Sequence, residues 1–209
     1  IAHGFYSWVP ADVREVLLGT LCRCLSPDGI AFVSHNTMPG CALRGIAWSL
    51  LRPHVAGIGD PARRISEARS MAALVAEAMA DQPGLAGVLA GEFRDVADRH
   101  EFQVMHDDLA VVNHPVLLRE IVAEADAHGL AWLADADVYR HPAPAYGEKM
   151  NAWLAAADRL TREHVIDHLR LRRYRESLFV HRAKGAGTPI AGERLATMHV
   201  GASNTTAER

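Results

Sequence analysis

The first residues of the chain combine side chains that can handle a proton and a cation. Residues 3–8, with the sequence HGFYSW, place a histidine, a tyrosine and a tryptophan within six positions. A histidine exchanges a proton near neutral pH, and aromatic faces attract cations. The segment follows Ile1-Ala2, which we expect to end a strand, and open α/β sheets bind ligands beyond the carboxyl ends of their strands. The alternative is that Tyr6 and Trp8 simply pack inside a core loop.

A pair of histidines later in the chain has the spacing of a zinc-binding helix. His164 and His168 lie one helical turn apart in the sequence HVIDH, which mimics the H-x-x-E-H motif. Asp167 replaces the glutamate base of that motif, and no third ligand is evident. We therefore favour a solvated helix face over a metal site, and we predict no metal ligands.

Two further clusters have both a functional and a structural interpretation. A basic run could bind phosphate, but such a run is more typical of a solvated face, which we favour. Its members are Arg170, Arg172, Arg173 and Arg175. Cys22 and Cys24 lie two positions apart on an expected helix, and we expect both to be packing residues.

The composition is that of an ordinary globular protein. The chain has 209 residues, of which 49% are hydrophobic and 22% charged, which excludes a disordered or collagen-like chain. No apolar run reaches the roughly 18 residues of a spanning helix, so we expect no membrane protein. A net charge of −3 and a pI of about 6.5 do not point to nucleic acid or an anionic membrane. Three cysteines without a C-x-x-C pair favour a reduced, cytoplasmic protein.

Hydrophobic periodicity and turn residues predict alternating helices and strands. The expected elements are a loop and helix over 7–25, a buried strand over 30–34, a helical section from 43 to about 99, a helix from about 114 to 128, a strand over 130–134, a loop over 141–144, a helix over 148–171 and a last strand over 176–181. Breaks in the helical section fall at Pro53 and within 57–61 and 82–84. This alternation predicts an α/β fold with a mostly parallel sheet, and apolar residues on both faces of 30–34 predict helix layers on both sides.

Several motifs together resemble one enzyme family. They are HGFYSWVP at 3–10, AFVSHNTMPG at 31–40, HDDL at 106–109, NHP at 113–115 and RYRESL at 173–178. Over about residues 1–183 the chain resembles class I S-adenosylmethionine-dependent methyltransferases that carry a methyltransferase regulatory domain. Because His106-Asp107-Asp108 belongs to this resemblance, we favour a capping or structural role over a metal site there.

The resemblance implies an α/β fold, the C-terminal half of a Rossmann-like class I methyltransferase sheet with an all-helical insert after the strand at 30–34. Residues 1–40 and 114–183 would form the α/β core, 41–113 a helical regulatory or lid insert, and 184–209 a linker or tail. Cys41-Ala42 stand where the family has Trp-His. The family's glycine-rich cofactor loop and its acidic partner are absent, so we expect a fragment that lacks the N-terminal cofactor half and is inactive alone.

The resemblance also implies a strand order. In this fold the last strand inserts antiparallel between its two predecessors, so residues near 177–182 should pair with both 30–34 and 130–134. The other edge of the strand at 30–34 should be unpaired or nearly so.

The implied cofactor is S-adenosylmethionine, and we assign roles to residues around the first two strand ends. The residues assigned to catalysis are Tyr6, Trp8 and Asn36, and those assigned to cofactor binding are His3, Gly4 and Phe5. We expect the catalytic set to converge on one crevice beside His3 and Gly4. The helical insert begins at the same edge, so part of it should roof the crevice and exclude water.

The expected activity is methyl transfer by the full-length protein. Related branches methylate lysines of bacterial outer-membrane proteins, which makes a protein side chain such as lysine the expected acceptor. The helical insert would shape that substrate site or mediate a homodimer, and we expect no nucleic-acid partner. One alternative is a non-catalytic helical regulatory or interaction module that binds a partner without the cofactor. A Rossmann-like oxidoreductase is disfavoured because nothing resembles a nicotinamide site.

Overall fold

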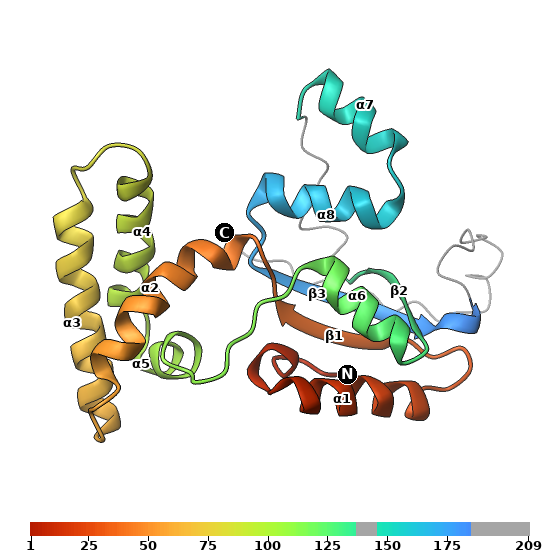
Figure 1. The fold of residues 1–209 in the computed structure, drawn as a ribbon, viewed down its shortest axis with the longest axis horizontal. Coiled ribbons are helices and arrows are strands. Elements are labelled where there is room, and N and C mark those ends of the chain that lie inside the picture. The colour runs from red at the N-terminus through yellow and green to blue at the C-terminus, as the bar shows by residue number, and fades with distance from the viewer. Residues whose placement is uncertain (137–145, 185–209) are drawn as a thin grey trace, which may run out of the picture.

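The computed structural model describes residues 1–136 and 146–184 (Figure 1). Its helices and strands follow the expected alternation. They are η1 Tyr6–Trp8, α1 Ala11–Cys24, β1 Ala31–Asn36, α2 Gly40–Val55, α3 Pro61–Met79, α4 Leu85–Asp98, α5 Glu101–Gln103, η2 Val104–Asp108, α6 Leu118–Ala127, β2 Leu130–Asp135, α7 Glu148–Ala156, α8 Arg159–Arg170, β3 Tyr174–His181 and η3 Arg182–Lys184. The loop expected over 141–144 and the tail from 185 onward lie outside the described residues.

The sheet has the strand order β1-β3-β2, with β3 antiparallel to both neighbours. Val33 faces Ser177 across one pair, and Trp132 faces Phe179 across the other. The order expected from the resemblance is therefore confirmed, and the far edge of β1 carries only an isolated parallel bridge from Ala2 to Val33. The expectation of a mostly parallel sheet is wrong for the described strands. Alternation of helices and strands makes β1 and β2 point the same way, but the central position is taken by a reversed strand.

Helices cover one face of this sheet. A single core joins Val33 of β1 and Phe179 of β3 to Leu18 of α1 and Ile121 of α6, with Leu160 of α8 at its border. Figure 1 shows α6 between α1 and α8, and α6 contacts both. The opposite face, which carries Phe32, is only partly buried in the described part of the chain. Apolar side chains on both faces of a strand thus did not guarantee two helix layers here.

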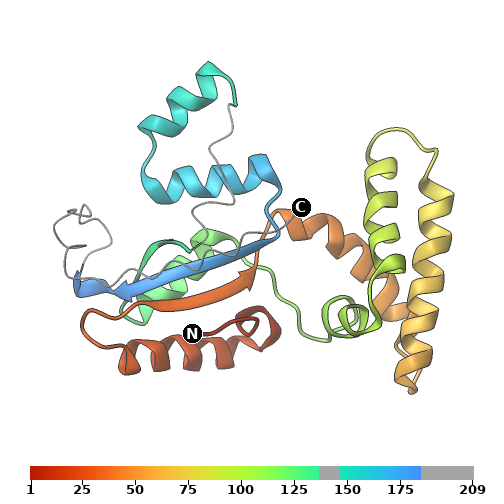
Figure 2. The same cartoon turned by 180° about the vertical axis from the view of Figure 1, so that it is seen from behind.

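The helical section, residues 40–108, has a core of its own. α3 packs along α4, and α2 crosses both (Figures 1 and 2). The fully buried side chains at the α3 contact are small, namely Ala68, Ala72 and Ala76, which allows the helix backbones to approach closely. Asp60 caps α3 as expected, because its carboxylate accepts a hydrogen bond from the Arg63 N–H at 2.7 Å. The break expected at Pro53 is wrong, since α2 continues to Val55.

The helix expected over 148–171 is two helices. α7 ends at Ala156, and Asp158 caps α8 by accepting a hydrogen bond from the Thr161 N–H at 2.9 Å. α7 buries only Leu154 among its residues and leaves Trp153 48% exposed, so the apolar spacing across this break does not reflect one continuous buried helix face. None of the described helices is both long enough and apolar enough to cross a lipid bilayer.

Candidate functional site

His3 and Gly4 lie against the carboxyl half of β1. The Gly4 N–H donates a hydrogen bond to Ser34 Oγ at 2.7 Å, and Gly4 adopts a φ of +60°, which a glycine tolerates. Nδ1 of His3 lies 3.3 Å from Ser34 Oγ and 3.4 Å from the hydroxyl of Tyr174. His3 is therefore held at the exposed edge of the sheet, and Phe5 beside it is 41% exposed.

Tyr6 does not share this environment. Its side chain is fully buried in the sheet core, its hydroxyl donates a hydrogen bond to the carboxylate of Glu124 on α6, and Arg14 lies over its ring at 5.5 Å. Burial, reinforced by Glu124, holds the pKa of Tyr6 far above its usual value. The expectation that Tyr6 converges with Trp8 and Asn36 on one crevice is therefore wrong. For this residue the alternative of a packed core aromatic holds.

Trp8 and Asn36 are brought together in a cavity of about 200 Å³, here called the polar cavity. It lies where the sheet meets the helical section. The sheet side contributes Trp8, Asn36, Asn113, Arg173 and Tyr174. The helical section contributes Cys41, Arg44, Trp48, Arg99 and Asp107. The insert thus forms one wall of the cavity that holds two of the three residues assigned to catalysis.

A chain of amide hydrogen bonds fixes Asn36. Its Nδ2 donates to Asn113 Oδ1 at 2.9 Å, and Asn113 Nδ2 donates to the carbonyl oxygen of Asp107 at 3.1 Å. The Asn36 backbone N–H donates to Ser7 Oγ at 2.8 Å. Asn113 was not among the assigned site residues. Asn36 and Asn113 both belong to motifs of the resemblance, but the sequence alone could not predict that their side chains lie next to each other.

Arg44 is the buried centre of the insert side. It is 3% exposed, its Nε lies 3.2 Å from Asp108 Oδ1, and its Nη1 donates to the carbonyl oxygen of Glu92. Trp48 Nε1 donates to the same Asp108 oxygen at 2.9 Å. Asp108, fully buried, is thus a structural anchor, as favoured for this motif, and its burial raises the pKa of its carboxyl group.

Two further arginines stand at the rim. Arg99 Nη1 lies 3.5 Å from carboxylate oxygens of both Asp107 and Asp108, and Arg173 pairs with Glu92. Cys41, on the same wall, donates its S–H to the Arg173 carbonyl at 3.3 Å, and burial raises its pKa to about 11. This thiol therefore stays protonated at neutral pH and is no nucleophile.

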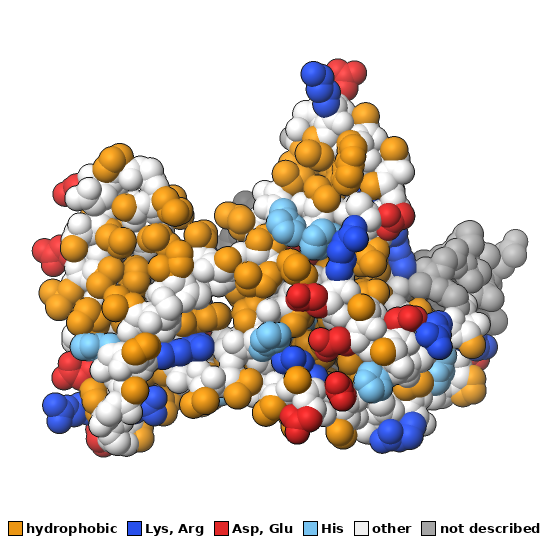
Figure 3. All heavy atoms as spheres, viewed as in Figure 1, with side chains coloured by type: hydrophobic (Ala, Val, Ile, Leu, Met, Phe, Trp, Pro, Cys, Tyr) orange, Lys and Arg blue, Asp and Glu red, His pale blue; other side chains and the backbone are white. Residues whose placement is uncertain are grey.

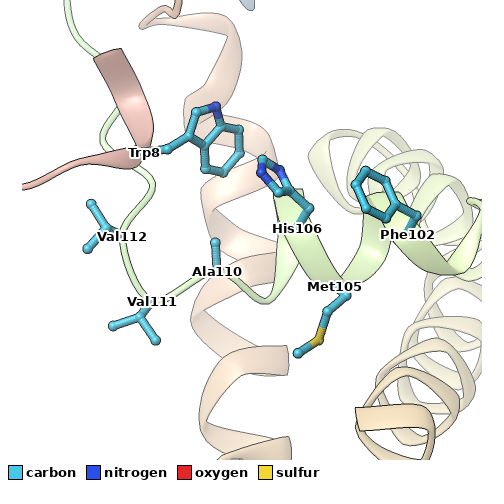
Figure 4. Close-up of a pocket in the computed structure, with 7 residues that line it drawn as sticks. All are labelled: Trp8, Phe102, Met105, His106, Ala110, Val111 and Val112. Carbon is cyan, nitrogen blue, oxygen red and sulfur yellow. The ribbon is translucent and has the colours of Figure 1, made fainter. Parts of the chain in front are cut away.

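A second hollow, with a mainly apolar lining, shares Trp8 with the polar cavity. Figure 4 shows the seven residues that line it. This apolar groove has a volume of about 460 Å³. The rings of Trp8 and His106 lie 4.8 Å apart, and His106 stacks on Phe102 at 5.8 Å. Phe102 is 71% exposed, so the groove is open. Trp8 is therefore a common wall of a small polar and a larger apolar space.

The expectation that the basic run lies on a solvated face is wrong for Arg172 and Arg175, which are buried. Arg175 is 1% exposed and Arg172 is 8% exposed. Arg175 Nε and Nη2 bind Asp167 at 2.9 and 2.8 Å, and its Nη1 binds Asp135 at 2.9 Å. The strand alternation places Arg175 on the same face as Phe179, and this is the signal that could have revealed its burial.

The described residues show no metal site at the histidine pair, and the cysteines form no disulfide. His168 Nδ1 lies 2.8 Å from the carbonyl oxygen of His164, which is a contact along one helix. No group of three or more His, Cys, Asp or Glu side chains suited to a metal occurs within residues 1–136 and 146–184. All three cysteines are free. Cys22 packs at the border of the sheet core as expected, whereas the packing role expected for Cys24 is wrong because its side chain is exposed.

Comparison with known proteins places this geometry in context. Residues 101–181, which span the end of the helical section and strands β2 and β3, match the family model described as a predicted methyltransferase regulatory domain. This matched segment of 81 residues is therefore related to the regulatory domain of methyltransferases. The recognition made from the motifs is confirmed at this level.

Two curated relatives come from Rickettsia prowazekii (strain Madrid E). The uncharacterised protein RP789 is 29% identical over 183 residues, a match that covers 87% of this chain and 33% of RP789. The uncharacterised protein RP028 is 23% identical over 126 residues, covering 60% of this chain and 50% of RP028. The chain therefore spans between a third and a half of the length of these relatives.

Two solved structures share the fold of this methyltransferase-related chain. PKMT2 from Rickettsia typhi superposes with a TM-score of 0.79 at 23% identity, over 93% of this chain and 37% of PKMT2. PKMT2 in complex with AdoHcy superposes with a TM-score of 0.79 at 24% identity, over 92% of this chain and 37% of PKMT2. At these identities the likeness is one of fold. It agrees with the confirmed strand order and with an α/β architecture rich in helices.

Proposed function

We propose that this chain forms the acceptor side of an S-adenosylmethionine-dependent methyltransferase, the C-terminal half of a Rossmann-like sheet with a helical insert. The proposal is carried by the match of residues 101–181 to the regulatory-domain family, together with the fold shared with PKMT2. The whole protein would act in the cytoplasm on a protein side chain such as lysine. Methyl transfer needs an aligned acceptor and a dry pocket, and the polar cavity offers such a place.

In this proposal Trp8 and Asn36 act on the acceptor. The Trp8 ring offers a face to a cationic group. The side-chain amide of Asn36 is held by Asn113, and its backbone N–H is held by Ser7. Arg44 and Trp48 of the insert close the opposite wall and limit the entry of water. Tyr6 has no role in the cavity in this proposal, because its side chain lies in the sheet core and its hydroxyl donates to Glu124.

The edge formed by His3, Gly4 and Phe5 is proposed to meet the cofactor. A Cβ placed on Gly4 would meet no atom within 4 Å, and His3 and Phe5 are exposed, so the described residues leave room there for a ligand. These features fit a cofactor that approaches the carboxyl end of β1. Bound S-adenosylmethionine would supply a methyl group on a sulfonium.

A homodimer built on the helical section belongs to the same proposal. Large apolar side chains remain exposed on α3 and α4, namely Leu74, Leu85 and Val88, which are 61%, 60% and 54% exposed. Figure 3 shows apolar side chains gathered over this part of the molecule. This surface equally supports the alternative of a non-catalytic interaction module, which would bind its partner without the cofactor.

Methyl transfer by the protein that contains this chain tests the proposal. Tritiated S-adenosylmethionine is incubated with a cell protein extract, and hydrolysed protein is analysed for methylated lysine. We expect Trp8→Ala and Asn36→Ala each to lower incorporation by about 100-fold, because the acceptor loses its alignment. His164→Ala is the matched control and should leave incorporation unchanged. Tyr6→Ala is not a useful probe, since it removes a buried core ring.

Incorporation that is unaffected by the Trp8 and Asn36 variants would remove the polar cavity from the reaction. The absence of any incorporation, with partner binding by the helical section retained, would favour the interaction module instead.

A further inference from the structure

The arginines of the polar cavity point to a ligand of a particular charge. Arg44, Arg99 and Arg173 line the cavity. Two of the carboxylates that neutralise them, Glu92 and Asp108, are absent from its lining and are 5% and 0% exposed. The cavity wall therefore presents mainly guanidinium donors, with the acidic partners placed behind them. Asp107 is the acidic side chain of the lining, and it faces Arg99.

One of these donors is left over. Arg44 uses Nε toward Asp108 and Nη1 toward the Glu92 carbonyl, whereas its Nη2 is buried and has no hydrogen-bond partner among the described residues. A buried donor without an acceptor is costly, and native proteins usually satisfy such groups. Oε2 of Glu92 and Oδ2 of Asp108 also lack a hydrogen-bond partner among the described residues, but each lies within 4 Å of an arginine nitrogen, at 3.7 Å from Arg44 Nη1 and 3.5 Å from Arg99 Nη1. Because Arg44 lines the cavity, a ligand with an acceptor oxygen would satisfy its remaining donor.

The chemistry of the cluster favours a carboxylate. A guanidinium fork matches the two oxygens of a carboxylate, and also those of a phosphate. The three arginines already face three acids, Glu92, Asp107 and Asp108, so the cluster is neutral, and a group with a single negative charge disturbs that balance less than a dianion does. A cavity of about 200 Å³ is of the size of one side chain, and Trp8 and Trp48 offer flat walls to its carbon atoms.

We propose that the polar cavity binds a carboxylate group. The group comes either from an acidic residue of the protein that is methylated, or from a free small acid. The first source rests on the proposed function, because Trp8 and Asn36 share the same cavity. The second does not depend on methyl transfer.

The four tryptophans of the chain provide an internal readout for binding to the 209-residue chain. Trp8 and Trp48 line the cavity, whereas Trp132 and Trp153 do not. The probes are butyrate, which carries a single carboxylate, and its neutral match butyramide, followed by NMR of the indole N–H signals. We expect saturable shifts of the Trp8 and Trp48 signals with the acid, at a Kd of about 1 mM, and none with the amide. The Trp132 and Trp153 signals should stay in place.

Substitutions of the arginines that line the polar cavity test whether they cause the NMR shifts. Arg99→Gln and Arg173→Gln should each weaken binding by about 10-fold, because each removes a charge-assisted hydrogen bond. Arg44→Lys keeps the charge but loses the fork, and should abolish the shifts. An unchanged Trp132 signal shows that each variant remains folded. Arg182→Gln, an exposed arginine on the sheet side, is the control and should bind as the unaltered chain does.

A blocked pentapeptide, Ala-Ala-Glu-Ala-Ala, separates the two sources. Binding at least about 10-fold tighter than butyrate would identify an acidic residue of a protein, and equal or weaker binding would identify a free acid. Equal shifts with acid and amide, or no shift of Trp48 with any carboxylate, would overturn the proposal. None of these measurements uses S-adenosylmethionine, so failure here is distinct from failure of the proposed function.

Discussion

The sheet and the helical section each bury an arginine among carboxylates, but they use it differently. On the sheet side, Arg175 has all three guanidinium nitrogens engaged by Asp167, Asp135 and Glu163. On the insert side, Arg44 leaves Nη2 without a partner beside a cavity. A guanidinium whose donors are all satisfied within the protein stabilises the fold, whereas one with a donor to spare has capacity for a ligand.

The two regions also differ in how they pack. The sheet core is built from large side chains such as Tyr6, Trp132 and Phe179, and the helical section closes around alanines of α3. They meet at Gly40, whose N–H donates to the carbonyl oxygen of Arg172 at 3.0 Å. This junction sets the distance between the two walls of the polar cavity.

The largest effect should follow from breaking the satisfied cluster. Arg175→Met removes the hydrogen bonds that Arg175 makes to Asp167 and Asp135 and leaves Arg172 as the cation beside both acids, and we expect a loss of about 3–5 kcal/mol in the free energy of unfolding. Urea denaturation followed by circular dichroism measures it. Arg182→Ala, which removes an exposed pair with Asp126, should cost at most about 1 kcal/mol. Similar losses for the two variants would contradict the structural role of Arg175.

The junction between the two regions should be nearly as sensitive. A Cβ on Gly40 would lie 2.5 Å from the carbonyl carbon of Arg172 and would also meet the carbonyl oxygen of Leu171. Because these are backbone atoms, Gly40→Ala should cost roughly 3 kcal/mol of unfolding free energy. Gly45→Ala is the matched control on the same helix, with nothing within 4 Å, and should stabilise the protein by about 0.5–1 kcal/mol. If Gly40→Ala and Gly45→Ala were equally stable, the close approach of Gly40 to the backbone of residues 171 and 172 would be contradicted.

The sheet region should lose stability in mild acid. His35 is 1% exposed, and burial lowers its pKa to about 3, far below the ordinary value of 6.5. The unfolded chain therefore binds the proton first. The contribution of neutral His35 is fully present above about pH 6.5 and falls as the pH drops toward about 3. We expect it to supply roughly 2 kcal/mol of the stability lost between pH 7 and pH 5.

Urea titrations at several pH values test this prediction. His35→Gln should flatten the pH dependence, while His54→Gln, at an exposed position, should leave it unchanged. An unchanged slope for the His35 variant would mean that the carboxylates alone set the acid sensitivity.

The smallest expected change in stability comes from ligand binding at Arg44. Butyrate at ten times its Kd should raise the free energy of unfolding of the chain by about 1.4 kcal/mol, because it binds the folded state only. The Arg99→Gln variant should gain much less at the same concentration. A gain of the same size in that variant would place the ligand elsewhere.

Much of the fold was predictable, because local signals decided it. The turn around Asp28-Gly29, the Asp60 cap and the left-handed Gly129, with a φ of +82°, bound elements that the periodicity had already indicated. The order β1-β3-β2 was not available from periodicity. It came from the resemblance, since the pairing of β1 with β3 joins residues more than a hundred positions apart, such as Val33 and Ser177.

The candidate site was predictable only in part. The sequence determined which chemistry-bearing residues follow each strand, and Trp8 and Asn36 do meet in one cavity. It did not determine that Tyr6 turns inward to Glu124, because a loop between a strand and a helix can direct a side chain to either side.

The sequence alone determined the alternation of elements, their caps and the residues at the strand ends. Only the tertiary structure decided how the charged residues are used. Arg172 and Arg175 belong to a run that is typical of a solvated face, yet the pleat of β3 and the approach of α8 enclose Arg175 with Asp167. Burial of a charge depends on partners brought by distant segments, and the desolvation that decides its role exists only once those segments have packed.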